Sequence, residues 1–112
     1  MTEAELQHAV IQLAHVHGWM VAHFRPMQDY KGQWRTPVAA DGKGFPDLVL
    51  VSQTTIMFIE LKSDKGRLTV EQKDWHDQLY NATIAVGTPF SNVWRPRDWN
   101  DGTIERMLRD LK

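Results

Sequence analysis

Two acidic residues and a lysine stand at the ends of two short apolar runs in the middle of the chain. Asp47 opens the run 48–51, and Glu60 and Lys62 close the run 56–62. The β-branched residues and short length of these runs predict two strands, joined by a polar turn into an antiparallel hairpin. Pairing places the start of the first strand beside the end of the second, and residues two apart on a strand share a face. We therefore expect Asp47, Glu60 and Lys62 to meet at one end of the hairpin.

Such a cluster favours a divalent cation. Two carboxylates about 4 Å apart, at an effective dielectric near 20, repel by roughly 4 kcal/mol. A hard cation that prefers oxygen ligands turns this repulsion into attraction. Lys62 could orient or deprotonate an attacking water, or neutralise charge that develops on a phosphoryl group. The combination is typical of metal-assisted phosphodiester hydrolysis, although the spacing alone also fits a salt-bridged strand end.

The residues around this cluster resemble a known nuclease pattern. The segments Gly44–Asp47 and Ile59–Lys62 resemble the PD-(D/E)XK signature, and the continuation Lys65–Trp75 is similar to the VRR-NUC branch of that superfamily. The resemblance extends from Thr2 to the segment around Pro96. It implies a small nuclease domain of the kind found alone in phages and as the catalytic domain of larger DNA-repair nucleases.

The resemblance also implies roles for individual residues. The implied ligands of Mg²⁺ or Mn²⁺ are Asp47, Glu60, the carbonyl of Leu61, and Glu5. The implied catalytic residues are Asp47, Glu60, Lys62, Gln72 and Glu5. Glu5 and Gln72 each have a structural alternative, because each is the last residue of a Thr-x-x-Glu/Gln capping box at a predicted helix start.

Length and composition limit the possible number of domains, kinds of metal site and cellular location. The chain has 112 residues, 42% hydrophobic and 24% charged, which predicts one domain over 1–112 with a single core. The absence of cysteine excludes disulfides and thiolate metal sites. There is no apolar stretch of about 18 residues and no positively charged leader, so we expect a cytoplasmic protein without a membrane partner.

Cations are distributed unevenly along the chain. The net charge is −1, which argues against a polycation, yet no Lys or Arg occurs before Arg25. Cations then flank the motif on both sides and could make one cleft locally positive. The predicted DNA contacts are Arg25, Lys43, Lys65, Arg67 and Lys73. Arg95 and Arg97 would either join this surface or cap acids of helix and sheet.

The irregular segment 25–43 has two interpretations. It mixes cations with aromatic residues, which suits phosphate contact and base stacking. Alternatively, Trp34 folds back as a lid on the core.

The predicted fold class is α/β, a restriction-endonuclease-like core with a mixed β-sheet flanked by helices. The predicted order is αβββαβ plus a C-terminal helix. The expected helices are 2–17, 69–80 and 103–111; the expected strands are 19–24, 48–51, 56–62, 82–86 and 93–94.

The leading interpretation is a divalent-metal-dependent DNA endonuclease. The family resemblance implies action on branched DNA such as Holliday junctions by a homodimer, since two symmetric incisions need two sites. One alternative is a non-catalytic DNA-binding module on the same fold, which has no reason to hold two like charges together. Another is a sequence-specific restriction-type nuclease, for which little chain remains to read bases.

Overall fold

A four-stranded mixed sheet forms the centre of the protein. The computed structural model describes residues 1–24, 27–28, 30–35, 39–86 and 91–112. The strands are β1 (Met20–His23), β4 (Leu48–Val51), β5 (Ile56–Leu61) and β6 (Ser91–Trp94), in the order β1-β4-β5-β6. β1, β4 and β5 pair antiparallel, whereas β6 lies parallel to β5. The predicted mixed sheet and central hairpin are confirmed.

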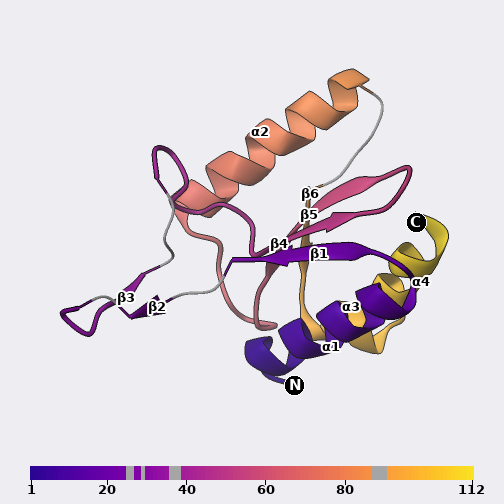
Figure 1. Cartoon of the computed structure of the whole chain (residues 1–112), viewed down its shortest axis with the longest axis horizontal. Coiled ribbons are helices and arrows are strands. Elements are labelled where there is room, and N and C mark those ends of the chain that lie inside the picture. The colour runs from indigo at the N-terminus through magenta and orange to yellow at the C-terminus, as the bar shows by residue number, and fades with distance from the viewer. Residues whose placement is uncertain (25–26, 29, 36–38, 87–90) are drawn as a thin grey trace.

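Helices cover both faces of this sheet (Figure 1). α2 (Val70–Val86) lies on one side, and α1 (Glu3–Val16), α3 (Pro96–Asn100) and α4 (Thr103–Asp110) lie on the other. With the small β2–β3 hairpin set aside, the order is αβββαβ followed by helices, as predicted. In the described part of the chain, no helix is both long and apolar enough to cross a bilayer.

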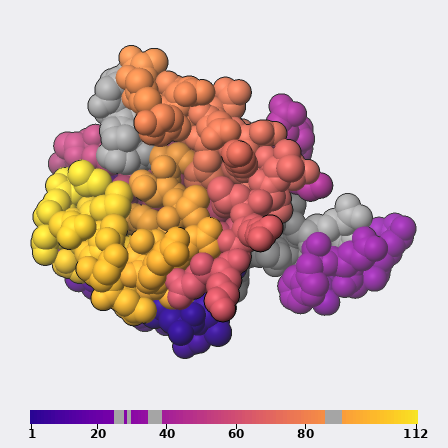
Figure 2. Space-filling view, turned by 180° about the vertical axis from the view of Figure 1, so that it is seen from behind, coloured from indigo at the N-terminus to yellow at the C-terminus, as the bar shows by residue number. Residues whose placement is uncertain are grey.

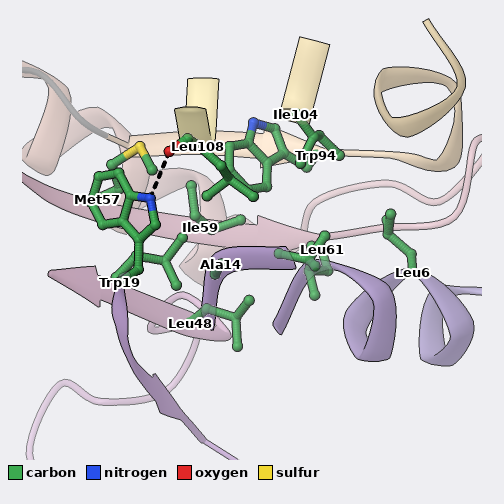
Figure 3. Close-up of a cluster of buried hydrophobic side chains, with 12 residues drawn as sticks. Leu6, Ala14, Trp19, Leu48, Met57, Ile59, Leu61, Trp94, Ile104 and Leu108 are labelled. Carbon is green, nitrogen blue, oxygen red and sulfur yellow. Dashed lines mark hydrogen bonds between the residues drawn. The ribbon is translucent and has the colours of Figure 1, made fainter. Parts of the chain in front are cut away.

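The apolar core lies between the sheet and the α1/α4 side (Figure 3). Alternate residues of β4 and β5 and one face of α1 are fully buried there. The Trp19 indole nitrogen donates a hydrogen bond to the Leu108 carbonyl at 2.9 Å, which joins the start of β1 to α4. Labelled members of this core are Leu6, Ala14, Leu48, Met57, Ile59, Leu61, Trp94 and Ile104.

The sequence prediction of a strand at 82–86 is wrong. α2 continues without a break from Val70 to Val86, and the strand beside β5 is β6. Short apolar runs fit strand and helix equally well by pattern, and no glycine or proline separates this one from the preceding helix. The Thr83 hydroxyl bonds the Tyr80 carbonyl at 2.9 Å, a local bond that suits a β-branched residue within a helix.

A short helix follows β6, in a segment for which the sequence predicted neither helix nor strand. α3 begins at Pro96, because proline is favoured at the first helical position. The last helix and the first helix follow prediction to within a residue or two, with Thr2 capping α1.

The irregular segment contains a small hairpin that projects from the body (Figures 1 and 2). It pairs β2 (Met27–Gln28) with β3 (Trp34–Arg35). The Trp34 side chain is 69% exposed, so the alternative in which it covers the core is wrong. Arg25, a predicted DNA contact, lies outside the described residues.

Candidate active site

The hairpin of β4 and β5 brings Asp47 beside Glu60. Leu48 pairs with Ile59, so the preceding and following positions oppose each other. The Asp47 Oδ2 atom accepts a hydrogen bond from the Leu61 amide at 2.9 Å, which fixes this carboxylate against the end of β5. The Asp47 carbonyl accepts from the Phe24 amide at 3.1 Å and extends the β1–β4 pairing by one step.

Among the residues that the structure describes, Glu60 is the one buried charged residue, at 1% exposure. Its Oε1 atom accepts a hydrogen bond from Gln72 Nε2 at 2.7 Å, whereas its Oε2 atom is buried without a partner among the described residues. Burial and then repulsion from Asp47 raise the pKa of Glu60 to about 8, against an opposing attraction from Lys62. A buried carboxylate oxygen without a partner is costly, and it marks the position that a cation would favour.

Gln72 combines the two roles that the sequence left open. Its Oε1 atom accepts from the Thr69 amide at 2.9 Å, and the Gln72 amide nitrogen donates to Thr69 Oγ1 at 3.1 Å, which completes the capping box at the start of α2. Its Nε2 atom remains for Glu60. An amide side chain has separate donor and acceptor atoms, so capping and contact with the acid pair do not compete.

Lys62 follows directly after β5 and is partly buried. Its amide donates to the Trp94 carbonyl at 3.1 Å, which holds this backbone to β6. It shares a sheet face with Glu60 by alternation, and its charge is among those that act on the pKa of Glu60. The structure therefore brings Asp47, Glu60, Lys62 and Gln72 together at one end of the sheet.

The loop before Asp47 sits directly on the first turn of α2. Gly44 has φ of +84°, and a Cβ atom there would lie 2.6 Å from Glu71 Cβ and 2.7 Å from the Gln72 nitrogen. Only glycine permits this approach, which sets the distance between the Asp47 loop and the Gln72 helix. The contact joins residues far apart in sequence, so spacing alone could not reveal it.

An aromatic cluster reinforces the same junction. The Phe45 ring packs edge-on against Trp75 at 5.0 Å, Phe24 at 5.3 Å and Phe58 at 6.1 Å between centroids. The Trp75 indole nitrogen donates to the Asp41 carbonyl at 2.9 Å. These contacts hold α2 against the loop that carries Asp47.

Glu5 is exposed and forms the capping box of α1. Its Oε1 atom accepts from the Thr2 amide at 3.0 Å, and hydrogen bonds with Thr2 lower the pKa of Glu5. Glu3, which the sequence did not single out, is the α1 acid whose charge contributes to the raised pKa of Glu60. A metal or catalytic role for Glu5 stays a prediction.

The basic residues lie around the α2 end of the site. Lys43 forms an ion pair with Glu71 at 3.2 Å and remains largely exposed. Lys65, Arg67 and Lys73 are exposed before and within the start of α2. Their contact with DNA stays a prediction.

The donors available to a metal are oxygens. The described residues contain no group of three or more His, Cys, Asp or Glu side chains placed to hold a metal ion. The pair Asp47 and Glu60 is supplemented by the Leu61 backbone. The Leu61 amide faces Asp47, and a strand residue directs its amide and carbonyl to the same neighbour. Two carboxylates and a carbonyl suit Mg²⁺ or Mn²⁺, which leave remaining positions to water and substrate.

Comparison with known families decides the classification. The model of the VRR-NUC domain matches residues 22–88, which is more than half of the chain and includes Asp47, Glu60, Lys62 and Gln72. The chain belongs to the VRR-NUC domain family. Membership supports a nuclease. Glu5 lies outside the matched region of this VRR-NUC chain.

Among solved structures, the VRR-NUC chain is similar to the 1.6 Å structure of Archaeoglobus fulgidus Hjc, a Holliday junction resolvase from an archaeal hyperthermophile. The identity is 19% and the TM-score 0.41, over 85% of this chain and 66% of that chain. No curated protein matches the sequence.

Proposed function

We propose that this VRR-NUC domain is a divalent-metal-dependent endonuclease that hydrolyses DNA phosphodiester bonds. The observation that carries the proposal is the acid pair. Glu60 is 1% exposed, and its Oε2 atom has no partner among the described residues. The charge of Asp47 raises the pKa of Glu60, and the charge of Lys62 lowers it. Holding two carboxylates together costs stability unless a cation compensates them.

Each residue of the site has a proposed task. Mg²⁺ or Mn²⁺, held by Asp47, Glu60 and the Leu61 carbonyl, would supply Lewis-acid activation of water and of the scissile phosphate. Lys62 would orient the attacking water and offset negative charge as it develops on the phosphoryl oxygens. Gln72 would keep the Glu60 carboxylate in a fixed orientation through its 2.7 Å hydrogen bond. Glu5 is proposed as an additional acid of the same site.

Branched DNA, including Holliday junctions, is the proposed substrate class. The β2–β3 hairpin projects from the body (Figure 2). Its residues Tyr30 and Trp34 are 92% and 69% exposed. β1, which leads to this hairpin, is tied to Asp47 through the Phe24 amide. Exposed aromatic rings beside a nuclease site suit stacking on the unpaired or distorted bases of a branch point. Arg25, Lys43, Lys65, Arg67 and Lys73 are proposed contacts to the phosphate backbone.

A homodimer is proposed because paired incisions need paired sites. An apolar hollow of about 230 Å³ opens on the β1 and β4 strands and is lined by Met20, Val21, Ala22, Val49 and Val51. Met20 is 75% exposed, and within the described chain β1 pairs with β4 alone. Exposed apolar surface at a sheet edge supports contact with a second copy. Sedimentation of the wild type and of Val49→Glu tests this, because a dimer seated here is expected to dissociate in the variant.

Cleavage assays test the activity and its substrate. A four-way junction, a 5′ flap and a plain duplex are incubated with Mg²⁺, Mn²⁺ or EDTA, and Lys62→Met is compared with the wild type. Lys112→Met is the matched control, since Lys112 is an exposed lysine at the end of the chain, outside the proposed site. We expect metal-dependent cutting that falls to a small residual rate in Lys62→Met and is retained in Lys112→Met, with DNA binding kept in both.

Other outcomes select the alternatives. Binding without cleavage under every metal condition would favour a DNA-binding module. Cuts that map to one recurring short sequence on a long duplex would favour a restriction-type nuclease. Equal cutting of plain duplex and junction would refute the preference for branched DNA.

A further inference from the structure

Arg95, immediately after β6, binds the backbone of a turn more than two dozen positions earlier in the chain. Its Nη1 atom donates hydrogen bonds to the carbonyls of Ser63 and Gly66, each at 2.6 Å, with the Asp64 carbonyl at 3.5 Å. The turn is closed by the Gly66 amide, which donates to the Ser63 carbonyl at 3.2 Å. Among the described residues, no carboxylate side chain forms an ion pair with this guanidinium. The charge of Arg95 is therefore directed at carbonyl dipoles and not at an acid. The sequence had predicted either a contact with DNA or a contact with acids of helix and sheet.

The turn 63–66 lies against the side chain of Lys62. A Cβ atom added to Gly66 would come within 3.5 Å of Lys62 Cδ, so the backbone of Gly66 lies beside the aliphatic stem of the lysine. The stem is thus bordered by backbone on this side, while the backbone amide of Lys62 donates to the Trp94 carbonyl at 3.1 Å.

Neighbouring residues of the same segment hold the turn at a second point. The Asp64 Oδ1 atom accepts a hydrogen bond from the Arg97 amide at 3.0 Å. The Arg95 amide in turn donates to Asp98 Oδ2 at 2.8 Å, which anchors the backbone of Arg95 at the start of α3. Hydrogen bonds therefore hold both the backbone of Arg95 and the turn that its guanidinium contacts.

The chemistry of this contact requires a cationic donor. Hydrogen bonds from an ionised donor are roughly twice as strong as neutral ones, and a guanidinium presents several N–H groups in a rigid plane. An aliphatic side chain of the same length would leave the carbonyls of Ser63 and Gly66 without this donor. A lysine would restore the charge but not the planar fork.

We propose that Arg95 is a positioning residue for Lys62, acting through the turn 63–66. It holds the turn against the lysine stem and so fixes the direction in which the ammonium group reaches the acid pair. The proposal rests on the proposed nuclease function in one respect, namely that Lys62 acts on the substrate. The clamp itself is a property of the fold and can be measured without cleavage.

The test compares Arg95→Met, Arg95→Lys and the control Arg106→Met. Arg106 is an exposed arginine on α4, within the helical layer on the far side of the sheet from α2. We expect Arg95→Met to lower kcat for junction cleavage about 100-fold with KM nearly unchanged, because small displacements of a catalytic group have effects of this size. Arg95→Lys should recover part of the loss, and Arg106→Met should match the wild type.

A double variant separates positioning from general damage. In a Lys62→Met background, Arg95→Met should lower the residual cleavage rate no further, because its effect passes through the lysine. A loss that multiplies with that of Lys62→Met would overturn the proposal, as would an unchanged kcat in Arg95→Met.

Two measurements do not depend on activity. Amide hydrogen exchange at Gly66 should accelerate in Arg95→Met and not in Arg106→Met, and the NMR signal of the Lys62 side-chain CH₂ next to nitrogen should shift in the same variant only. Unchanged exchange and an unchanged Lys62 signal would refute the clamp. If the wild type cuts no substrate while both signals change, the nuclease proposal fails and the coupling of Arg95 to Lys62 stands.

Discussion

Replacing Glu60 by glutamine should stabilise the metal-free protein at alkaline pH while removing its ability to respond to metal. The carboxyl is 1% exposed, and one of its oxygens has no partner among the described residues. Burial and the Asp47 charge raise the pKa of Glu60 from 4.5 to about 8. Ionised Glu60 is therefore a source of instability in the folded state, and the isosteric amide removes that charge.

The magnitude follows from the two pKa values. A carboxyl with a raised folded-state pKa contributes stability that is fully present below its unfolded pKa, here 4.5, and is lost as the pH rises through about 8. At about 1.4 kcal/mol for each pH unit between these two pKa values, the free energy of unfolding of the wild type falls by about 5 kcal/mol at most. Solvent at the edge of the site screens the charge, so we expect about 2 kcal/mol. For a domain of this size that is a Tm difference of about 10 °C.

The assay is thermal and urea unfolding in EDTA at pH 5 and pH 8.5. The stability of Glu60→Gln relative to the wild type should rise by about 2 kcal/mol between the two pH values, because the variant lacks the ionisation that costs the wild type stability. Any fixed cost of burying the new amide is present at both pH values and cancels in the difference. Glu71→Gln is the matched control, since Glu71 is on the surface and paired with Lys43, and it should show no such gain.

Added Mg²⁺ extends the same experiment. It should stabilise the wild type increasingly as the pH rises, because the cation binds ionised Glu60, and it should leave Glu60→Gln unaffected. If the difference in stability between Glu60→Gln and the wild type is the same at pH 5 and pH 8.5, the assignment of Glu60 as a buried acid with a raised pKa is refuted.

Three further predictions concern the surroundings of the site. Gly44→Ala should lower the free energy of unfolding by about 3 kcal/mol in urea titration, because Gly44 has a positive φ and an added Cβ would lie 2.6 Å from Glu71. Gly18 has a similarly positive φ but open space around it, so Gly18→Ala should lower the free energy of unfolding by about 1 kcal/mol. Equal losses in the two variants would contradict the close contact at Gly44. Burial lowers the pKa of His76, so neutral His76 stabilises the fold above pH 6.5, and this stabilisation is lost as the pH falls. His76→Gln should therefore flatten the dependence of stability on pH between about pH 5 and 7. An unchanged dependence would refute this. Trp34→Ala should weaken junction binding about tenfold in fluorescence anisotropy without lowering Tm, and a lowered Tm would instead indicate a packing role.

Several features followed from local rules that the sequence carries. The central hairpin was predictable because two short β-branched runs with a polar turn between them pair in one way. Strand alternation then places Glu60 and Lys62 on one face, and antiparallel pairing places Asp47 beside them. The capping boxes of Thr2 and Thr69 are likewise local, and the structure contains both.

Local rules failed where two states fit the same residues. The run 82–86 is apolar and β-branched enough for a strand, yet it continues α2, and β6 is the strand that pairs with β5. Trp34 could have covered the core or pointed to solvent, and only the path of the β2–β3 hairpin makes it exposed. Pattern does not report which neighbour is available, so these choices depend on the whole fold.

The sequence by itself determined which residue types stand at the ends of which strands, because those relations span only a few positions. The tertiary structure decided what surrounds them. It buries Glu60 beneath Gln72, seats Gly44 on the first turn of α2, and directs Arg95 to the turn behind Lys62. Each of these contacts joins residues from different elements, and the energy of each depends on burial and distance, which become defined only when the elements pack.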